Sequence, residues 1–230
     1  MRVVFFSDIH GNQYTFEKFR EQITTVKPDI VVFCGDVFGY YYGQEYILTK
    51  MRGINDLICI LGNHDEYFFK VLEGTCDTDK LVAKFGNSYR NIKNKISTAN
   101  AQFVRSFLPY WDFSVDGVHI GVFHGSPVNY RNDRVYPNTK IISTALYQKF
   151  DYVILGHTHH KMVRSIGETI VLNPGSLGQQ RDGKGCSYLC LDTVNRSYSF
   201  HVVCYDVLAL LLEVEQNDGG NAKLKEVLLR

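Results

Sequence analysis

The sequence predicts an α/β protein in which two β-sheets pack face to face, with helices outside them and a short helical tail at the C-terminus. Three observations lead to this prediction. The first third of the chain repeats a short apolar run that ends in a small residue and a polar one, helical patterns separate these runs, and the later part consists mostly of strand-like runs. Alternating strands and helices favour a parallel sheet, and the later strands supply a second sheet.

The opening apolar runs are "VVFFSD" at 3–8, "IVVFCGD" at 30–36 and "LICILGN" at 57–63. Continuous apolar runs of this length are typical of strands buried on both faces. Between the first two runs, residues 14–26 place apolar side chains on one helical face, and Asn12 can cap that helix. Between the second and third, residues 44–53 predict a helix that ends at Gly53.

The pattern changes after residue 66. Residues 66–109 are less regular, with helical stretches and a helix predicted from about 98 to 108 because Pro109 closes it. A hairpin is predicted around Asp116 and Gly117. Further strands are predicted at 152–155, 161–166, 169–172, 187–192 and 197–204, and two short amphipathic helices in the tail at 205–230. We therefore expect one domain over residues 1–230, with its core in about 1–204.

The composition limits the function classes. Apolar residues make up 45% and charged residues 21% of the 230 residues, as in ordinary soluble proteins. A net charge of +1 provides no field toward nucleic acid or anionic lipid, so we expect no specific nucleic-acid binding and no membrane association. The start "MRVVFFSD" already reads as a strand and lacks a signal-peptide layout, which predicts a cytoplasmic protein.

The six cysteines form no CxxC pair. Cys34, Cys59, Cys190 and Cys204 lie inside or beside strand-like runs, so we expect buried, reduced thiols rather than disulfides or a zinc knuckle.

Residues of metal-ligand type follow the predicted strands directly. They are Asp8, His10, Asp36, Asn63, His64, Asp65 and His124, together with the histidines of "GHTHH", namely His157, His159 and His160. Ligands collect beyond the carboxyl ends of strands in open α/β sheets, so these side chains are expected to converge. A mixed oxygen and nitrogen set suits Mn, Fe, Zn or Co better than Ca or Mg. The set is too large for one ion, and two ions that share a carboxylate fit it best.

The motifs "DIH" at 8–10, "GD" at 35–36, "GNHD" at 62–65, the histidine at 124 and "GHTH" at 156–159 resemble, in order and composition, the calcineurin-like metallophosphoesterase family. The resemblance covers at least residues 2–204. Finer features, among them "GDVFGY" and "NPGSLGQQRDG", are similar to the bacterial branch related to diadenosine tetraphosphatases and small phosphodiesterases. The fold that this family implies is an αββα sandwich.

The resemblance implies a role for each motif residue. Asp8, His10 and His159 would bind one metal ion, Asp36 would bridge to a second, and Asn63, His124 and His157 would complete that second site. His160 is expected to be a non-ligand. His64 would face the leaving-group oxygen as a general acid or charge stabiliser. Asp65 would orient His64, or be an ordinary solvated or capping residue. The isolated His119 and His201 are expected to be half-exposed histidines of strands.

The implied chemistry is hydrolysis of a phosphate ester. Two divalent ions, two carboxylates and a bridging hydroxide leave a net charge of +1, so the site should bind a phosphate anion, and the metal-activated hydroxide would attack the phosphorus in line. Manganese is the first choice of metal, with Fe, Zn, Co or Ni as alternatives. A member of this fold that only binds proteins, like a retromer subunit that has lost catalytic residues, is an alternative. The complete ligand set argues against it.

The ester class is a second question. The Ser/Thr phosphatase branch carries an Arg in "GDxxDRG", but this chain has "GDVFGYY" there. Because a guanidinium is the best grip for a dianionic phosphate, its absence favours phosphodiesters or phosphoanhydrides over monoesters or phosphoproteins.

The same loop suggests a small phosphorylated substrate such as a nucleotide or a dinucleoside polyphosphate. Tyr40, Tyr41 and Tyr42 follow the bridging Asp36, and at least one of them should face the cleft and stack on a base. Arg131, Arg134 and Arg181 are candidate grips for further phosphates. The sequence leaves a homo-oligomer open.

Overall fold

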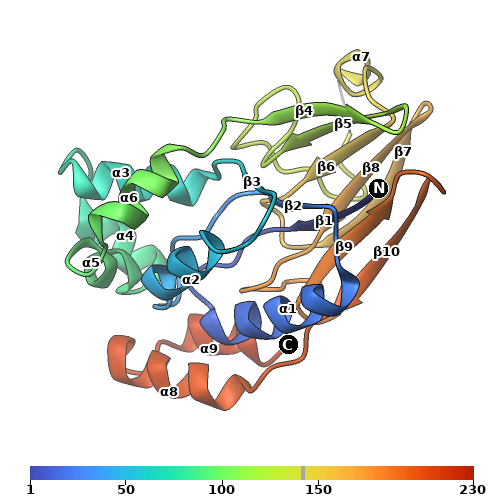
Figure 1. Ribbon diagram of the computed structural model, residues 1–230. Helices are drawn as coiled ribbons and strands as arrows, with labels where there is room; N and C mark the ends of the chain where they lie inside the picture. Colours follow the sequence, from blue (N-terminus) through green and yellow to red (C-terminus); the bar gives the residue numbers. More distant parts are fainter. Residues whose placement is uncertain (141–142) are drawn as a thin grey trace.

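The computed structural model describes residues 1–140 and 143–230, and in these ranges the chain forms two five-stranded sheets packed against each other (Figure 1). The strand orders are β10-β9-β1-β2-β3 and β4-β5-β6-β8-β7. Helices lie outside the sheets and two more form the C-terminal end, so the predicted αββα sandwich with a helical tail is confirmed.

The first sheet contains β1 (Arg2–Phe6), β2 (Ile30–Phe33), β3 (Leu57–Cys59), β9 (Ser187–Asp192) and β10 (Ser197–Val202). The pairs β1–β2 and β2–β3 are parallel, whereas β9 runs antiparallel to both β1 and β10. Val3 and Phe5 belong to the apolar cluster between the sheets, while Val4 and Phe6 belong to the cluster beneath the helices. Because successive side chains of a strand point to opposite faces, a strand covered on both faces is apolar throughout.

The second sheet contains β4 (Trp111–Val115), β5 (Val118–Phe123), β6 (Tyr152–Leu155), β7 (Lys161–Ile166) and β8 (Thr169–Pro174). The predicted hairpin joins β4 to β5, and both of its turn residues, Asp116 and Gly117, have positive φ angles of 49° and 70°. Such a turn matches the twist of the two strands it connects. β5, β6 and β8 run parallel, so β5 and β6 end at the same edge of the sheet.

Two helices, α1 (Gln13–Val26) and α2 (Gln44–Met51), cover the outer face of the first sheet along the lower side of Figure 1. α1 begins at the predicted cap, where the Asn12 side chain accepts a hydrogen bond of 3.2 Å from the Thr15 N–H. Its buried face carries Phe16 and Phe19, which pack on Phe6 of β1.

The irregular region after β3 contains α3 (Asn63–Leu72), α4 (Thr78–Phe85), α5 (Ser88–Lys93) and α6 (Thr98–Arg105). These helices lie together at the left of Figure 1. The helix predicted to reach residue 108 ends at Arg105 instead. The reason is that Leu108 leaves the helix to bond with the end of β3, its N–H donating to Cys59 and its carbonyl accepting from Leu61.

The remaining helices are α7 (Thr144–Tyr147), α8 (Val207–Asp218) and α9 (Ala222–Leu228). α8 and α9 form the predicted tail, and they enclose Tyr41 in a small apolar cluster with Leu210, Val214 and Leu224. β10 ends at Val202, two residues earlier than predicted, and Cys204 beyond it is exposed, which corrects its expected burial. Cys34, Cys59 and Cys190 are buried free thiols, as predicted.

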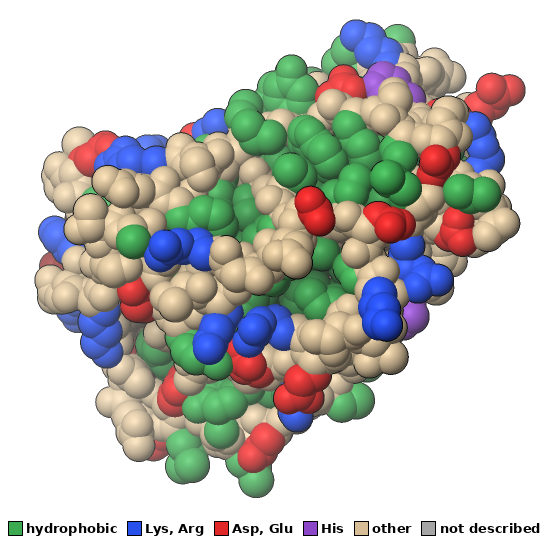
Figure 2. Space-filling view, in the orientation of Figure 1, with side chains coloured by type: hydrophobic (Ala, Val, Ile, Leu, Met, Phe, Trp, Pro, Cys, Tyr) green, Lys and Arg blue, Asp and Glu red, His purple; other side chains and the backbone are tan. Residues whose placement is uncertain are grey.

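One edge of the sandwich leaves apolar side chains half-buried. Figure 2 shows hydrophobic side chains gathered over the region of β4 and β5. On the edge strand β4, Trp111 and Phe113 stack with ring centroids 3.8 Å apart. Among the described residues, no helix is long and apolar enough to cross a membrane.

Candidate metal centre

The segments that directly follow five strands, which are loops except for the first turn of α3 after β3, meet at one edge of the sandwich. They follow β1, β2, β3, β5 and β6, and they carry the residues singled out in the sequence: Asp8, His10, Asp36, Asn63, His64, Asp65, His124, His157 and His159. All nine side chains are buried. Backbone hydrogen bonds tie the loops together, for example from the Asp8 N–H to the Gly35 carbonyl at 2.9 Å and from the His10 N–H to the Asp36 carbonyl at 3.2 Å.

The first group of candidate ligands consists of Asp8, His10 and His159, whose ligand atoms lie within 4.8 Å of one another. Oδ1 of Asp8 is 3.3 Å from Nε2 of His159 and 3.7 Å from Nε2 of His10. The two Nε2 atoms are themselves 3.0 Å apart. The grouping is the one that the sequence predicts for the first metal ion.

The second group consists of Asp36, His124 and His157, again with ligand atoms within 4.8 Å. Asn63 belongs beside it, because its Oδ1 lies 3.2 Å from Nε2 of His124. Oδ2 of Asp36 lies 3.2 Å from Nε2 of His124 and 3.9 Å from Nε2 of His10 in the first group. Asp36 therefore stands between the two groups, where a bridging carboxylate is expected.

Each carboxylate has one oxygen held by the backbone and one buried oxygen without a hydrogen bond. Oδ2 of Asp8 accepts from the His157 N–H at 3.1 Å, and Oδ1 of Asp36 accepts from the His64 N–H at 2.7 Å. Within residues 1–140 and 143–230, the opposite oxygens, Oδ1 of Asp8 and Oδ2 of Asp36, have no hydrogen-bond partner. An unpaired buried carboxylate oxygen is costly unless a cation or donor compensates it. These two atoms thus fit metal ions.

The histidines are oriented for the same purpose. Nδ1 of His10 donates to the Phe38 carbonyl at 2.6 Å, Nδ1 of His124 to the Cys34 carbonyl at 2.8 Å and Nδ1 of His159 to the Gln179 carbonyl at 2.6 Å. A proton on Nδ1 leaves the Nε2 lone pair free for a metal ion. His157 differs, since its Nε2 accepts from Nε of Arg134 at 3.3 Å.

Backbone strain is concentrated at these ligands. Among the residues that the structure describes, Asp8, His10, Asp36, His157 and His159 have positive φ angles of 54°, 49°, 69°, 67° and 60°. Such conformations cost on the order of 1–3 kcal/mol each and persist only where the surroundings impose them. The sharp turns allow residues two apart in the sequence, such as His157 and His159, to point to different groups.

One glycine makes the close approach of two loops possible. A Cβ atom on Gly62 would lie 2.0 Å from Oδ1 of Asp36. The N–H of His64 could not then reach that oxygen. "GNHD" therefore needs its glycine for steric reasons.

The electrostatics keep several ligands in the form that binds metal. Burial would raise the pKa of Asp8, but the neighbouring histidines, His159 first, hold it well below its usual range. Burial, and next the charge of His159, hold the pKa of His10 well below normal, so its ring is neutral. Burial lowers the pKa of His124, but the Asp36 carboxylate outweighs it and raises that pKa to about 9. A cation bound at His124 would therefore displace a proton.

His64 lies next to both groups without joining either. Its ring stands edge-on to that of His10, with centroids 4.9 Å apart, and Nδ1 is 2.7 Å from the hydroxyl of Tyr89. Burial, and next the charge of His10, hold the pKa of His64 well below its ordinary value. Tyr89 was not identified from the sequence, because nothing in "NSYRN" at 87–91 marks it as a partner of a residue 25 positions earlier.

Asp65 takes the capping role at the start of α3, one of the alternatives expected for it. Its carboxylate accepts from the backbone N–H groups of Gly62, Asp36 and Val37 at 2.9, 3.0 and 2.9 Å. Burial, and next the charge of Asp36, raise the pKa of Asp65 to about 7. Asp65 thus joins the loops after β2 and β3, and the hydrogen bond to the His64 ring comes from Tyr89 instead.

A pocket of about 430 Å³ opens over the two groups. Its lining contains Asp36, Asn63, His64, His157 and His159 from the centre, and Tyr40, Tyr67, Lys84, Phe85, Asn132, Arg134 and Arg181 around it. Tyr40, Arg134 and Arg181 were singled out in the sequence, and the Tyr40 hydroxyl is 2.9 Å from Nη2 of Arg181. Tyr67, Lys84 and Phe85 were missed, because they come from the region where the sequence pattern is least regular.

Three other predicted substrate residues do not line this pocket. Tyr41 is fully buried against the C-terminal helices, and the Tyr42 hydroxyl donates to Asp218 of α8. Arg131 pairs with Glu66 and lines a separate depression. His160 bonds through Nδ1 to the Thr158 carbonyl and lies outside both ligand groups, in line with its expected role as a non-ligand.

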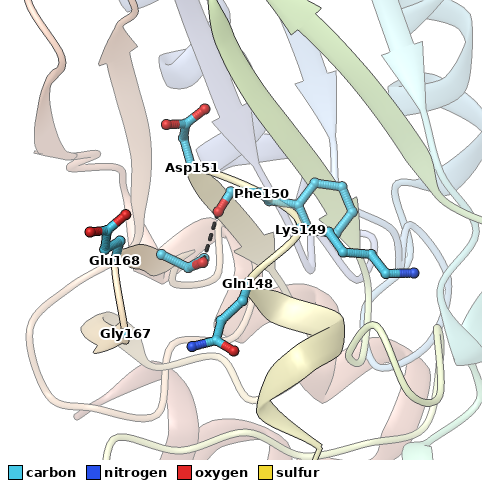
Figure 3. A pocket seen from close by; sticks show the side chains of 7 residues that line it. Gln148, Lys149, Phe150, Asp151, Gly167 and Glu168 are labelled. Carbon is cyan, nitrogen blue, oxygen red and sulfur yellow. Dashed lines mark hydrogen bonds between the residues drawn. The ribbon is translucent and has the colours of Figure 1, made fainter.

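A second depression, of about 380 Å³, lies where β6 and β8 begin (Figure 3). Gln148, Lys149, Phe150, Asp151, Gly167, Glu168 and Thr169 line it. Its polar groups are partly used within the chain, since Thr169 donates to the Phe150 carbonyl at 2.7 Å and Asp151 pairs with Arg196 at 3.1 Å. The metal-ligand groups follow the other end of β6, so this depression is separate from them.

Comparisons with known proteins agree with the geometry. The uncharacterized protein MJ0912 of Methanocaldococcus jannaschii is 25% identical over an alignment of 236 positions that covers 92% of this chain and 90% of that protein. The crystal structure of a metallophosphoesterase from Sphaerobacter thermophilus shares the fold with a TM-score of 0.76 and 21% identity, covering 100% of this chain and 98% of that one. A diadenosine tetraphosphatase candidate of known structure also shares it, with a TM-score of 0.57, 12% identity and coverage of 89% and 94%.

The model of one protein family matches residues 1–196, which include every candidate ligand. With this match over most of its length, and with ligand groups that could hold two metal ions, the chain belongs to the calcineurin-like phosphoesterase superfamily.

Proposed function

We propose that the protein is a dinuclear-metal phosphoesterase that hydrolyses phosphodiester or phosphoanhydride bonds. The observation that carries the proposal is a pair of buried carboxylate oxygens, on Asp8 and Asp36, that have no hydrogen bond within the described part of the chain and lie within 4 Å of histidine Nε2 atoms. Asp8, His10 and His159 would hold one ion, and Asn63, His124 and His157 the other, with Asp36 between them. Two divalent transition-metal ions, manganese foremost and Fe, Zn, Co or Ni as alternatives, suit this mixed oxygen and nitrogen set.

When bound, the ions would supply Lewis-acid activation of the phosphoryl group and of the attacking water. The chain itself would orient and neutralise the substrate. Arg134 and Arg181 at the pocket rim can pair with phosphate oxygens. As the water oxygen bonds to phosphorus and the bond to the leaving oxygen breaks, His64 would pass a proton to that leaving oxygen. The negative charge of the phosphate favours the protonated imidazole that this step requires.

Metal analysis of site variants tests the proposal. Purified protein incubated with manganese should contain about two ions per chain. Asp36→Asn should lower the content of both ions, because the side chain stands between the two groups. His64→Ala should keep both ions and reduce turnover on the order of 100-fold or more. A manganese content near zero in the unmodified protein would contradict the proposal. A loss of manganese in His64→Ala would contradict the role proposed for His64.

A second candidate function is hydrolysis of phosphomonoesters, including phosphoproteins. Arg134 and Arg181 favour it, because both reach the pocket and could grip a dianionic phosphate despite the missing arginine after Asp36. The ratio of activities on bis-p-nitrophenyl phosphate and p-nitrophenyl phosphate, with manganese, separates the two. We expect the diester to be preferred, and a strong preference for the monoester would reverse the order. A protein-binding role without catalysis would give no metal-dependent activity on either compound.

The pocket further supports a nucleotide substrate, such as a dinucleoside polyphosphate. Tyr40 offers an aromatic ring beside three cations, Lys84, Arg134 and Arg181, and the lining includes a single carboxylate, Asp36, among the described residues. A substrate with several phosphates and a base would complement both features.

A further inference from the structure

The wall of the pocket next to His64 is aromatic. Phe85, the last residue of α4, is 5% exposed, and its ring centroid lies 4.5 Å from that of His64 and 5.3 Å from that of Tyr40. Tyr67 of α3 lies 5.6 Å from His64 and 6.1 Å from Phe85, and it is half-buried. If His64 protonates the leaving oxygen, the rest of the leaving group must pass along this wall.

A cation lies on the same wall. Nζ of Lys84 stands 4.9 Å from the centroid of the Phe85 ring, and the exposed Lys84 side chain lines the pocket. A flat ring that packs on Phe85 or Tyr67 would bring an attached anion within reach of this ammonium group. Aromatic surface and positive charge together match a nucleotide, whose base stacks and whose phosphate pairs with a cation.

The turn that follows Phe85, at Gly86 and Asn87, packs against the C-terminal tail. Both carboxylate oxygens of Asp218, at the end of α8, accept from the Asn87 N–H at 2.9 and 3.1 Å. The Asn87 side chain donates to the Asn217 carbonyl at 2.8 Å. Gly86 permits this approach, because a Cβ on it would lie 2.9 Å from Oδ2 of Asp218 and its φ is +79°. The tail therefore holds Asn87, two residues after Phe85.

We propose that Tyr67, Lys84 and Phe85 form a subsite for a nucleotide leaving group, and that Asp218 positions this subsite from the C-terminal tail. The proposal rests on the proposed phosphoesterase function for its place in the reaction. In that reaction a water oxygen bonds to phosphorus, the bond to the oxygen of the departing nucleotide breaks, and that oxygen takes the proton from His64. The subsite holds the departing nucleotide.

Binding measurements test the subsite without turnover. Isothermal titration of the protein, metal-free and manganese-loaded, gives the Kd for AMP and for adenosine. Phe85→Leu should weaken both ligands at least about fivefold, the lower end of the effect of base stacking on an aromatic side chain. Lys84→Gln should weaken AMP and leave adenosine unaffected, because only AMP carries the phosphate. Lys80→Gln, an exposed lysine at the start of α4, is the matched control and should bind as the unmodified protein does.

Unchanged AMP binding in Phe85→Leu, or no AMP binding to the unmodified protein, would overturn the subsite. Phe85 also packs on the core, so Tyr67→Leu repeats the test at a half-buried position whose replacement is less disruptive. An equal loss of AMP and adenosine in Lys84→Gln would remove the phosphate contact from the proposal.

Kinetics test the positioning role of Asp218. Asp218→Ala should raise KM for diadenosine tetraphosphate at least about fivefold with little change in kcat, because the wall shifts while the metal ligands stay in place. Asp218→Asn keeps an acceptor for the Asn87 N–H and should recover part of the loss. Glu215→Ala, on the same helix but paired with Lys225, is the control. A fall in kcat with an unchanged KM would contradict the role.

The two proposals fail in different ways. If the manganese-loaded protein hydrolyses bis-p-nitrophenyl phosphate but none of the subsite variants changes nucleotide binding, the subsite is wrong and the phosphoesterase stands. If metal is bound and no phosphate ester or anhydride is hydrolysed, the phosphoesterase is wrong, and the AMP titrations still decide whether the wall binds nucleotides.

Discussion

The hydroxyl oxygen of Tyr89 lies 2.7 Å from Nδ1 of His64 and 3.2 Å from the carbonyl oxygen of the same histidine. The hydroxyl has one hydrogen, and it donates this hydrogen to the carbonyl. Nδ1 must then be the donor of the shorter bond, so the His64 ring carries a proton on Nδ1. Nε2 lies on the side of the ring that faces away from Tyr89. Because His64 lines the pocket, Tyr89 holds the imidazole in the orientation that proton transfer would need.

Replacing Tyr89 with Phe should therefore impair the step in which the leaving group departs. We expect kcat to fall about tenfold or more on substrates with an alkyl or nucleoside leaving group, since a misoriented acid loses part of the contribution of acid catalysis. The fall should be smaller for p-nitrophenolate, which leaves readily without a proton. Steady-state kinetics on both kinds of diester measure the difference.

The matched control is Tyr188→Phe, a buried tyrosine of β9 whose ring stacks on His201. It should leave the ratio of the two activities unchanged. If Tyr89→Phe lowered both activities by the same factor, the hydroxyl would act on something other than the protonation of the leaving group.

Gly62→Ala should abolish metal binding. The new Cβ would fall 2.0 Å from Oδ1 of Asp36, so the carboxylate between the two ligand groups would have to move. Gly53→Ala adds the same methyl group where the nearest atom is the Lys50 carbonyl at 3.5 Å, and it should bind metal normally. Manganese content after dialysis measures both, and a full complement of ions in Gly62→Ala would show that the loop tolerates the displacement.

The tyrosines after Asp36 should separate into two classes. Tyr40 lines the pocket, so Tyr40→Leu should raise KM for diadenosine tetraphosphate with little effect on thermal stability. Tyr41 is fully buried among the tail helices, so Tyr41→Ala should lower the free energy of unfolding by about 3–5 kcal/mol, the usual cost of removing a buried aromatic ring. Thermal denaturation and KM measurements on both variants test this assignment. A raised KM in Tyr41→Ala without a loss of stability would show that Tyr41 contacts the substrate.

The hairpin of the second sheet predicts a pH-dependent contribution to stability. His119 of β5 bonds to Asp112 of β4, and this bond, opposed by slight burial, raises the pKa of His119 above 6.5. A histidine whose pKa is higher in the folded than in the unfolded protein stabilises the fold fully at pH values below its unfolded pKa of about 6.5. This stabilisation is lost as the pH rises through its folded pKa. Asp112→Asn should thus lower Tm at pH 5.5 and have no effect at pH 9. Glu168→Gln, an exposed carboxylate in another turn of the same sheet, should lack this dependence.

Much of the fold could be predicted from local pattern. The apolar runs at the start became β1, β2 and β3 because strands buried on both faces must be apolar throughout, and the Asn12 cap and the hairpin at Asp116–Gly117 depend on neighbouring residues alone. The region after β3 was less predictable. Its helices are short, and α6 ends where Leu108 pairs with β3, a contact that no local pattern contains.

The candidate ligands could also be found in the sequence, because each follows a strand and the carboxyl ends of parallel strands lie at one edge. Their neighbours could not. Tyr41 has the same local surroundings as Tyr40, and only the position of the C-terminal helices buries one and leaves the other beside the pocket. Arg131 would suit a phosphate as well as Arg134 does, but Glu66 pairs with it.

The sequence by itself thus determined the order of the elements, the sandwich and the set of residues that could hold metal, since these follow from strand periodicity and from motifs within a few residues of each strand end. Only the tertiary structure decided that Tyr89 rather than Asp65 contacts the His64 ring, and that Lys84 and Phe85 stand over the centre with Asp218 behind them. Those contacts join residues from 21 to 131 positions apart, and their partners are set by how helices pack at the end of a sheet, for which a local sequence pattern carries no signal.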